Sequence, residues 1–289
     1  MPDLVSVIVP AYNAAETLTA QLDALSRQTY AGNWEAVVVD NRSTDNTRSL
    51  VTMRQQTMPR LRWVAAAERR GVGYARNVGA GATQGDLLAF CDADDVVDPS
   101  WLEALVAAAA CSDIVGGRFD GTSINPPHVS AWRDDVPHDR LMTSLGFYPF
   151  AAGFNFAVWR EVVQALRGWK TAYLLGSEDV DFSWRAQISG YQVSFAPNAI
   201  VAYRYRSTLR GLARQFRHYG RAEALLYRDF RANGARRAPA KEYVRGWCTL
   251  LRSTPRSLAN LTSRGRWVRD VMYRMGRLEG AVIHRVVFW

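Results

Sequence analysis

Three aspartates stand close together directly after an apolar segment of the chain. Asp92, Asp94 and Asp95 follow residues 86–91, whose sequence DLLAFC predicts a buried strand. Carboxylates at positions i and i+2 after a strand can face one pocket and bind a hard divalent cation through oxygen, and Mg²⁺ or Mn²⁺ suits such a site. From the spacing alone, a solvated acidic turn that caps the next helix is the alternative.

A second group of acids occurs at residues 177–181, in the sequence SEDVD. Ser177, Glu178 and Asp179 are residues that the first turn of a helix favours, because the helix dipole stabilises negative charge there. By itself this segment predicts only the start of a helix.

The segments between these groups alternate between two patterns. Short apolar or β-branched runs predict strands covered on both faces, and between them apolar residues recur at helical spacing, as at Leu18, Leu22 and Leu25. This order is typical of an α/β fold with a doubly wound, mostly parallel sheet. The strands are predicted at 5–10, 34–40, 61–66 and 86–91.

Polar residues follow three of the predicted strands. Tyr12 comes after the first, Asp40 ends the second, and the aspartates at 92–95 follow the fourth. Ligands of doubly wound sheets bind beyond the carboxyl ends of the strands, so we expect these residues to line one crevice.

The pattern changes after residue 97. Asp98 and Pro99 fit the N-cap and first position of a helix over 101–110, so Asp98 is interpreted as a cap and not as a ligand. The alternation then weakens, with one further strand predicted at 114–119 and a stretch containing Pro and Asp at 125–140. This part of the chain indicates a second subdomain.

Five sequence blocks, in this order and spacing, resemble family 2 glycosyltransferases with the GT-A fold. A lone D-x-D triplet would be a weak signal, whereas five ordered blocks over roughly residues 4–206 are specific. The blocks are VSVIVPAYN, VVVDNRSTDNT, RGVGYARNVGA, GDLLAFCDADD and GSEDVDFSWRAQISGY.

The resemblance implies an inverting transfer of a sugar from a nucleoside-diphosphate sugar to an acceptor hydroxyl. It also implies a nucleotide-sugar-binding half at 1–110 and an acceptor-binding half at 111–205, and a basic helical extension at 206–289 follows them in the sequence. The donor is expected to be UDP-, GDP- or dTDP-linked. A sugar-1-phosphate nucleotidyltransferase would need a Gly-rich loop with Lys or Arg after the first strand, and the loop AYNAAETL has neither.

Donor-side roles follow from the same resemblance. Pro10, Ala11, Tyr12 and Asp40 would hold the base and ribose, with Tyr12 stacking on the ring. Arg76 lies where the family places a cation near the nucleotide, and a guanidinium suits phosphate oxygens.

The resemblance makes the aspartate triplet the centre of the donor site. Asp92 would contact the ribose or the metal, and Asp94 would be the principal ligand of Mn²⁺ or Mg²⁺. A metal that bridges the diphosphate stabilises the negative charge of the leaving group.

On the acceptor side, an attacking hydroxyl must lose its proton. The resemblance makes Asp179 the general base and lets Glu178 orient the base or the acceptor. Asn155, Asp95 and Trp184 are weaker candidates for acceptor contacts.

One position departs from the family pattern. In the segment NAIVAYRYRS the family frequently has a histidine that completes the metal site, and this chain has Tyr203. Either Asp94, phosphate oxygens and water suffice, or another group such as His218 substitutes. A catalytically inactive GT-A-fold nucleotide-binding or scaffold protein is the alternative function.

The basic residues are concentrated in the extension. Residues 1–202 contain 16 Arg and Lys against 22 Asp and Glu, whereas 203–289 contain 20 against 5. Residues 209–230 form an amphipathic helix on a helical wheel, with an apolar stripe opposite an arginine stripe. The apolar stripe either packs on the catalytic domain or on a second subunit in a homodimer, or it attaches the chain to an anionic membrane. Nucleic acid is not an expected partner, because no nucleic-acid module is recognisable.

The cysteines indicate a reducing compartment. Cys91, Cys111 and Cys248 are odd in number and far apart, which argues against disulfides and zinc, and each is expected to be a small core residue. No secretory leader or membrane-spanning segment is predicted. We therefore expect a cytoplasmic protein. If the extension attaches to a membrane, the protein is peripheral on the inner face of that membrane.

Overall fold

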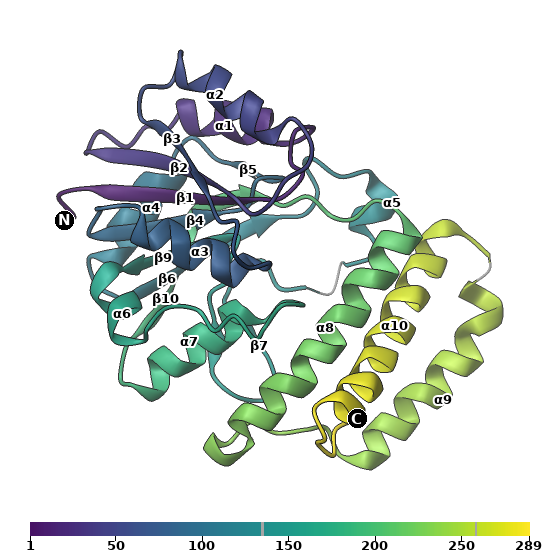
Figure 1. Ribbon diagram of the computed structural model, residues 1–289. Helices are drawn as coiled ribbons and strands as arrows, with labels where there is room; N and C mark the ends of the chain where they lie inside the picture. Colours follow the sequence, from purple (N-terminus) through teal and green to yellow (C-terminus); the bar gives the residue numbers. More distant parts are fainter. Residues whose placement is uncertain (134–135, 258) are drawn as a thin grey trace.

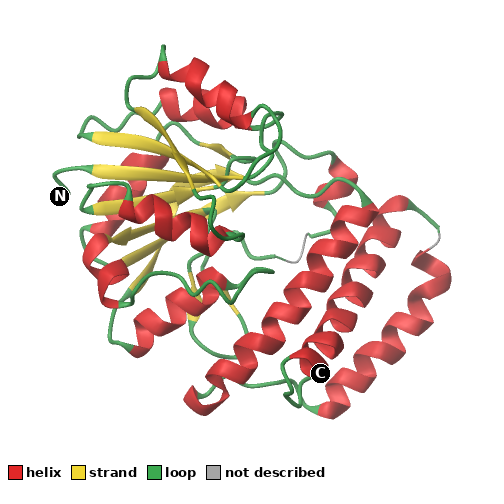
Figure 2. Ribbon diagram, in the orientation of Figure 1, coloured by secondary structure: helices red, strands yellow, loops and turns green. Residues whose placement is uncertain are grey.

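A computed structural model describes residues 1–133, 136–257 and 259–289. A central sheet is covered by helices, and the C-terminal helices form a separate layer beside it (Figures 1 and 2). The strands are β1 (Val5–Ala11), β2 (Trp34–Asp40), β3 (Leu61–Ala65), β4 (Leu87–Cys91), β5 (Val96–Val97), β6 (Ile114–Asp120), β7 (Met142–Thr143), β8 (Pro149–Phe150), β9 (Asn155–Trp159) and β10 (Val193–Ala202). The helices are α1 (Leu18–Ser26), α2 (Thr47–Gln55), α3 (Val72–Gly81), α4 (Trp101–Ala109), α5 (Pro127–Ser130), α6 (Arg160–Ala165), α7 (Glu178–Ile188), α8 (Leu209–Phe230), α9 (Ala240–Ser257) and α10 (Leu261–Ile283).

The described residues form an eight-stranded, mostly parallel sheet. Its order is β3-β2-β1-β4-β9-β6-β10-β5, in which β9 is antiparallel to both of its neighbours and β5 is antiparallel to β10. Ala11 pairs with Asp40, and Cys91 pairs with Asn155. One end of the sheet therefore carries the carboxyl ends of β1, β2 and β4 together with the start of β9. The predicted acceptor half contributes β9 and β6 to the same sheet as the donor half.

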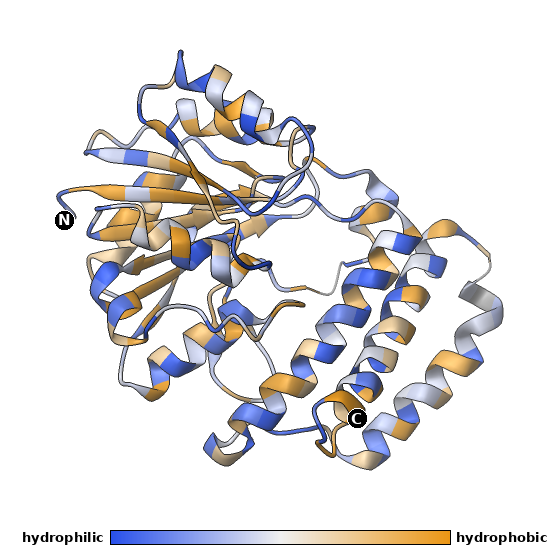
Figure 3. Ribbon diagram, viewed as in Figure 1, coloured by the Kyte–Doolittle hydropathy of each residue, from blue (hydrophilic) through white to orange (hydrophobic). Residues whose placement is uncertain are grey.

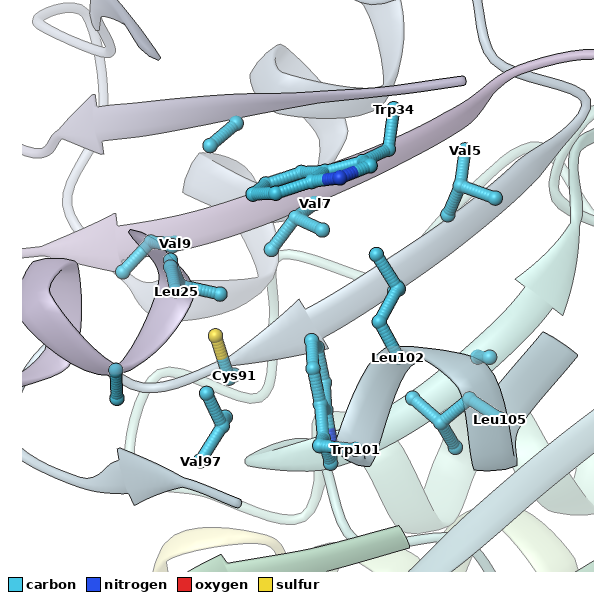
Figure 4. Packing of buried hydrophobic residues seen from close by; sticks show 14 of the residues in the cluster. Val5, Val7, Val9, Leu25, Trp34, Cys91, Val97, Trp101, Leu102 and Leu105 are labelled. Atoms are coloured by element: carbon cyan, nitrogen blue, oxygen red, sulfur yellow. The ribbon is translucent and has the colours of Figure 1, made fainter. Parts of the chain in front are cut away.

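Side chains on both faces of the sheet are buried, which explains why the strand sequences do not alternate. One face packs on α1 and α4, and Figure 4 shows Val5, Val7 and Val9 of β1 in one cluster with Leu25 of α1 and with Trp101 and Leu102 of α4. The opposite face carries Ile8, Val37 and Val39 and packs on α3, α6 and α7. The predicted doubly wound α/β class is confirmed.

Two local predictions need correction. Helix α4 begins at Trp101 and Ser100 is its N-cap residue, so Asp98 is not the N-cap. The Asp98 carboxylate instead accepts hydrogen bonds from the Ser100 amide (2.9 Å) and hydroxyl (2.8 Å), which orders the turn before the helix. Of the cysteines, only Cys91 lies in the core. Cys111 follows the end of α4 and Cys248 lies on α9, and both are exposed.

The apolar stripe of α8 packs on the catalytic domain. Leu212 joins a cluster with Phe119 and Trp132, and Leu226 and Phe230 join a cluster around Trp184. Of the alternatives for this apolar stripe, the structure shows that it packs on the catalytic domain. None of the helices within the described ranges has both the length and the apolar character needed to cross a bilayer.

Small residues allow α8 and α10 to pack closely. A Cβ atom at Gly220 of α8 would overlap the carbonyl oxygen of Tyr273, and one at Gly276 of α10 would overlap the carbonyl oxygen of Arg217. The two backbones thus touch along this line, and a larger side chain would force the helices apart.

We expect Gly220→Ala to destabilise the protein by about 1–3 kcal/mol, because overpacking a close contact forces backbone shifts. The melting temperature should fall by roughly 2–8 °C in thermal denaturation. Gly81→Ala is the matched control, since a Cβ there meets nothing within 4 Å. Equal melting temperatures for the two variants would show that the α8–α10 contact adapts to a methyl group.

Candidate active site

A buried arginine joins the two halves of the candidate site. Arg76 lies on α3 with only 3% of its side chain exposed. One of its guanidinium nitrogens donates a hydrogen bond to Glu178 Oε1 at the start of α7, and another lies 3.8 Å from Asp92 Oδ1 at the end of β4. Gly153 leaves room for this guanidinium, because a Cβ atom there would overlap it.

Asp179 is held at the start of α7 beside this arginine. Its Oδ2 accepts a hydrogen bond from the Gly153 amide (2.8 Å), and its Oδ1 accepts one from the Val180 amide (2.9 Å). Ser177, which precedes the helix, has a left-handed backbone with φ of 70°. The carboxylate is partly exposed. It is therefore fixed in direction and open to a ligand.

Three carboxylates share the single charge of Arg76. Burial raises the pKa of Glu178 to about 7, although Arg76 opposes this shift. Burial likewise raises the pKa of Asp92 to about 6, again against the effect of Arg76. Burial would lower the pKa of Arg76, but Glu178, Asp92 and Asp179 raise it. The arginine therefore stays charged, and the pKa values of Glu178 and Asp92 are raised toward neutral pH.

The aspartate triplet provides a set of oxygen atoms suited to a divalent cation. Carboxylate oxygens of Asp92, Asp94 and Asp95 all lie within 4.8 Å of one another. Asp95 is fully buried; its Oδ1 accepts a hydrogen bond from the Arg204 amide (2.7 Å), while its Oδ2 has no hydrogen-bond partner among the described residues. A buried carboxylate oxygen without a partner is costly unless a cation binds it, so the residues fit Mg²⁺ or Mn²⁺.

Arg206 contacts the triplet in a way that the sequence did not indicate. Its Nη1 donates to Asp94 Oδ2 at 3.1 Å. Tyr203, at the position of the family histidine, has a pKa raised well above its usual value by burial and by the nearby Tyr219 and Asp95, so its phenol stays protonated. His218 lies in a groove with arginines of α8. Tyr203 and Arg206 thus lie near the triplet, whereas His218 lines a groove elsewhere on α8.

The other expected donor residues lie at the same end of the sheet, at the carboxyl ends of β1 and β2. Tyr12 follows β1 with 64% of its side chain exposed, so its ring is free to stack. Asp40 is buried and its Oδ1 accepts a hydrogen bond from the Ser43 amide (2.9 Å). Pro10 and Ala11 are the last residues of β1.

Asn41 is a supporting residue whose role the sequence did not reveal. Its amide nitrogen donates to the carbonyl oxygens of Ala66 (2.6 Å) and Arg69 (2.7 Å), and its Oδ1 accepts from the Gly71 amide (2.9 Å). These bonds hold the loop that leads into α3, which carries Arg76. A polar residue at a strand end was the available signal, but it does not distinguish a ligand contact from a loop anchor.

Two of the weaker acceptor candidates are buried in structural contacts. Asn155 accepts from Trp101 Nε1 (2.9 Å) and donates to the carbonyl oxygens of Arg118 (2.7 Å) and Ala199 (2.8 Å). Trp184 is fully buried, and its Nε1 donates to the Tyr148 carbonyl oxygen (2.8 Å). Neither side chain presents a surface to an acceptor, so the expected acceptor contacts need correction. Asn155 instead joins β9 to α4, β6 and β10, and Trp184 packs with Phe147 and Phe230.

Solved structures share this architecture. The mannosyltransferase PcManGT from Pyrobaculum calidifontis, in complex with GDP-Man and Mn²⁺, superposes with a TM-score of 0.69 at 22% identity, over 96% of this chain and 87% of that one. TarS 1-349 of S. aureus, in complex with UDP, gives a TM-score of 0.55 at 18% identity, over 97% of this chain and 91% of that one. The fold is that of GT-A glycosyltransferases.

Sequence comparisons identify the family. The model for Glycosyl transferase family 2 matches residues 6–167. The glycosyltransferase AglE of Haloferax volcanii is 31% identical over 216 residues, which cover 74% of this chain and 71% of AglE. The WfgD protein of Escherichia coli, a UDP-Glc:alpha-D-GlcNAc-diphosphoundecaprenol beta-1,3-glucosyltransferase, is 36% identical over 36% of this chain and 40% of its own length. The chain belongs to glycosyltransferase family 2 and is a glycosyl-transferring enzyme.

The raised pKa of Glu178 has a measurable consequence for stability. The unfolded chain releases this proton near pH 4.5, whereas the folded protein holds it to about pH 7. Between these values the folded state binds more protons, so stability falls as the pH rises.

We expect Glu178→Gln to remove this dependence, because the amide cannot ionise. In metal-free buffer, the unfolding free energy of the wild type relative to the variant should fall by up to about 3 kcal/mol from about pH 5 to about pH 8. Urea denaturation at several pH values measures this difference, and the exposed Glu161→Gln is the control. A constant difference would mean that Glu178 ionises normally in the folded protein.

Proposed function

We propose that the enzyme transfers a sugar from a nucleoside-diphosphate sugar to an acceptor hydroxyl with inversion of configuration, and that Asp179 is the general base. The observation that carries this proposal is the arrangement around Arg76. Asp179 and Glu178 on the acceptor side and Asp92 on the donor side lie around the same guanidinium. A donor bound to the triplet would thus have its reacting carbon close to a fixed carboxylate.

We assign nucleotide binding to the carboxyl ends of β1 and β2. The exposed Tyr12 ring would stack on the base, Asp40 would accept a hydrogen bond from the base, and Pro10 and Ala11 would line the floor. Arg76 would favour the negative charge of the diphosphate through its buried guanidinium. The GDP-Man and UDP complexes of the structural relatives support a UDP-, GDP- or dTDP-linked donor.

The metal is assigned to Asp94 and Asp92, with Asp95 as a third oxygen ligand or a buried support. Mn²⁺ or Mg²⁺ bound there would stabilise the negative charge of the departing nucleoside diphosphate. The Mn²⁺ in PcManGT and the unpartnered Asp95 Oδ2 support this assignment. Arg206, which bonds Asp94 in this structure, would then bond the phosphate oxygens of the donor instead. A guanidinium pairs with phosphate as well as with carboxylate, since both of these groups are negatively charged.

Asp179 would act once in the reaction. Its carboxylate accepts the proton of the acceptor hydroxyl while that oxygen attacks the anomeric carbon from the face opposite the diphosphate. The Gly153 and Val180 amides keep the carboxylate oriented. Glu178, bonded to Arg76, positions α7 and the guanidinium. A single displacement inverts the anomeric configuration.

The acceptor is proposed to be carried by a lipid at a membrane surface. The diphosphoundecaprenol-linked acceptor in the name of WfgD supports this class. Helix α8 passes the entrance on the acceptor side, since its Tyr219 ring lies beside Gly176, just before α7. Attachment of region 206–289 to an anionic membrane would bring that entrance close to the lipid.

Replacing the base should abolish turnover without loss of donor binding. We expect Asp179→Asn to lower kcat by about 10²–10⁴-fold, because the amide cannot accept the proton, while the Kd for the donor stays within a few-fold. Release of nucleoside diphosphate with a competent acceptor measures turnover, with Glu161→Gln as the control. Turnover within a few-fold of the wild type would exclude Asp179 as the base.

Removing the principal metal ligand should affect donor binding only when metal is present. Calorimetry with UDP-, GDP- and dTDP-sugars, with Mn²⁺ and with a chelator, should show at least about tenfold weaker metal-dependent binding for Asp94→Asn. In the chelator the variant and the wild type should bind equally. If the wild type binds none of these nucleotide sugars under any condition, the proposed donor and metal assignments are wrong and the scaffold alternative is favoured.

A further inference from the structure

A basic groove lies between α8 and α10, apart from the candidate active site. It has a volume of about 230 Å³. The groove is formed mainly by one face of α8, with a methionine of α10 on the other side. Its lining includes Arg210, Arg214, Arg217, His218, Arg221 and Met272.

The groove carries more positive charge than its surroundings balance. Arg217 and Arg221 both donate to Glu279 of α10. Arg210 and Arg214 are exposed and have no acidic partner in the described part of the chain. The four guanidinium groups that line the groove thus have one carboxylate partner between them among the described residues, which leaves a net charge of about +3 without any contribution from histidine.

The pKa of the His218 imidazole is affected by this positive charge. Burial lowers the pKa of its imidazole, and Arg221, Arg214 and Arg217 lower it further. The imidazole is therefore neutral at physiological pH and can donate one hydrogen bond. Guanidinium forks and a neutral imidazole together suit an oxyanion such as phosphate.

Exposed apolar side chains lie on the same face of α10 as Glu279. Met275 precedes Glu279 by one helical turn, and Val282 and Ile283 follow it by one turn, so these residues are neighbours on the helix surface. They are 38%, 80% and 58% exposed, respectively. Figure 3 shows this apolar end of α10 next to the C-terminus, with hydrophilic turns on the neighbouring α8.

This combination favours a lipid surface over the other anionic partners. Arginines beside protruding aliphatic side chains are typical of segments that lie in the headgroup layer, where charge meets lipid phosphate and apolar groups enter the acyl boundary. A single-stranded nucleic acid would need broad aromatic platforms, and the described residues that line the groove include no Phe, Tyr or Trp.

We propose that the α8–α10 groove binds the phosphate of an anionic lipid headgroup while Met275, Val282 and Ile283 enter the membrane interface. This gives a specific site to the membrane attachment proposed above. Tyr219 lies one residue from His218 on α8 and beside the entrance to Asp179. Lipid bound in the groove would therefore hold the acceptor entrance near the membrane surface.

Co-sedimentation with vesicles of phosphatidylcholine, with and without phosphatidylglycerol, tests the proposal. Wild-type protein should bind the anionic vesicles, and Arg210→Gln/Arg214→Gln should bind them about tenfold or more weakly, because two phosphate contacts are lost. Val282→Ser/Ile283→Ser should also weaken binding. The matched control is Arg27→Gln/Arg60→Gln, which removes two exposed arginines, one directly after α1 and one directly before β3. Helix α1 and strand β3 lie on the other side of the molecule from α8 and α10 (Figure 1).

The readout is binding, so it is independent of glycosyl transfer. Asp179→Asn should bind the vesicles like the wild type even though it does not turn over. Wild-type binding by Arg210→Gln/Arg214→Gln, or an equal loss in the Arg27→Gln/Arg60→Gln control, would overturn the site. Binding of inorganic diphosphate in calorimetry without vesicle binding would assign the groove to a soluble anion and overturn the lipid assignment.

Discussion

The candidate site depends on one buried cation that serves three carboxylates. Removing Arg76 from water costs several kcal/mol unless negative partners meet it, and those partners come from the end of β4 and the start of α7. Burial also raises the pKa of Glu178 and of Asp92, and the charge of Arg76 opposes both shifts. The charge balance therefore fixes α3, α7 and the end of β4 relative to one another, and with them the distance between the proposed donor and acceptor residues.

The extension is joined to this centre by packing of a different kind. One side of α8 contributes Leu212, Leu226 and Phe230 to the clusters of the catalytic domain, whereas another side meets α10 through glycines that bring the backbones into contact. With these two faces occupied, the arginines lie on the remaining face and along its border with α10, where Arg217 and Arg221 reach Glu279. The strong segregation seen on the helical wheel thus results from two interfaces.

Sequence patterns predicted the parts of the structure that are local. Uninterrupted apolar runs located β1, β2 and β4, because a strand covered on both faces cannot alternate. The triplet and the acids at 178–179 were found because each lies within a few residues of its neighbours. The bond between Arg76 and Glu178 was not predicted, since it joins residues 102 positions apart and leaves no periodicity.

Burial also separates residues that look alike in sequence. Asn155 and Trp184 resemble acceptor contacts in a glycine-rich or acidic segment, but their hydrogen bonds are satisfied inside the protein. Arg206 was unremarkable in a basic segment until folding brought its guanidinium to Asp94. In each case the partner comes from another part of the chain, which only the tertiary structure brings close.

The position of β9 has a consequence for synthesis of the chain. Strand β4 ends at Cys91, but its partner on one side begins only at Asn155. A growing chain therefore carries β1, β2, β3 and β4 with one edge of backbone hydrogen-bonding groups unpaired until the residues of β9 leave the ribosome. An open edge of apolar strands invites pairing with other chains. The donor-side half is thus vulnerable to aggregation during translation until the later half completes its sheet.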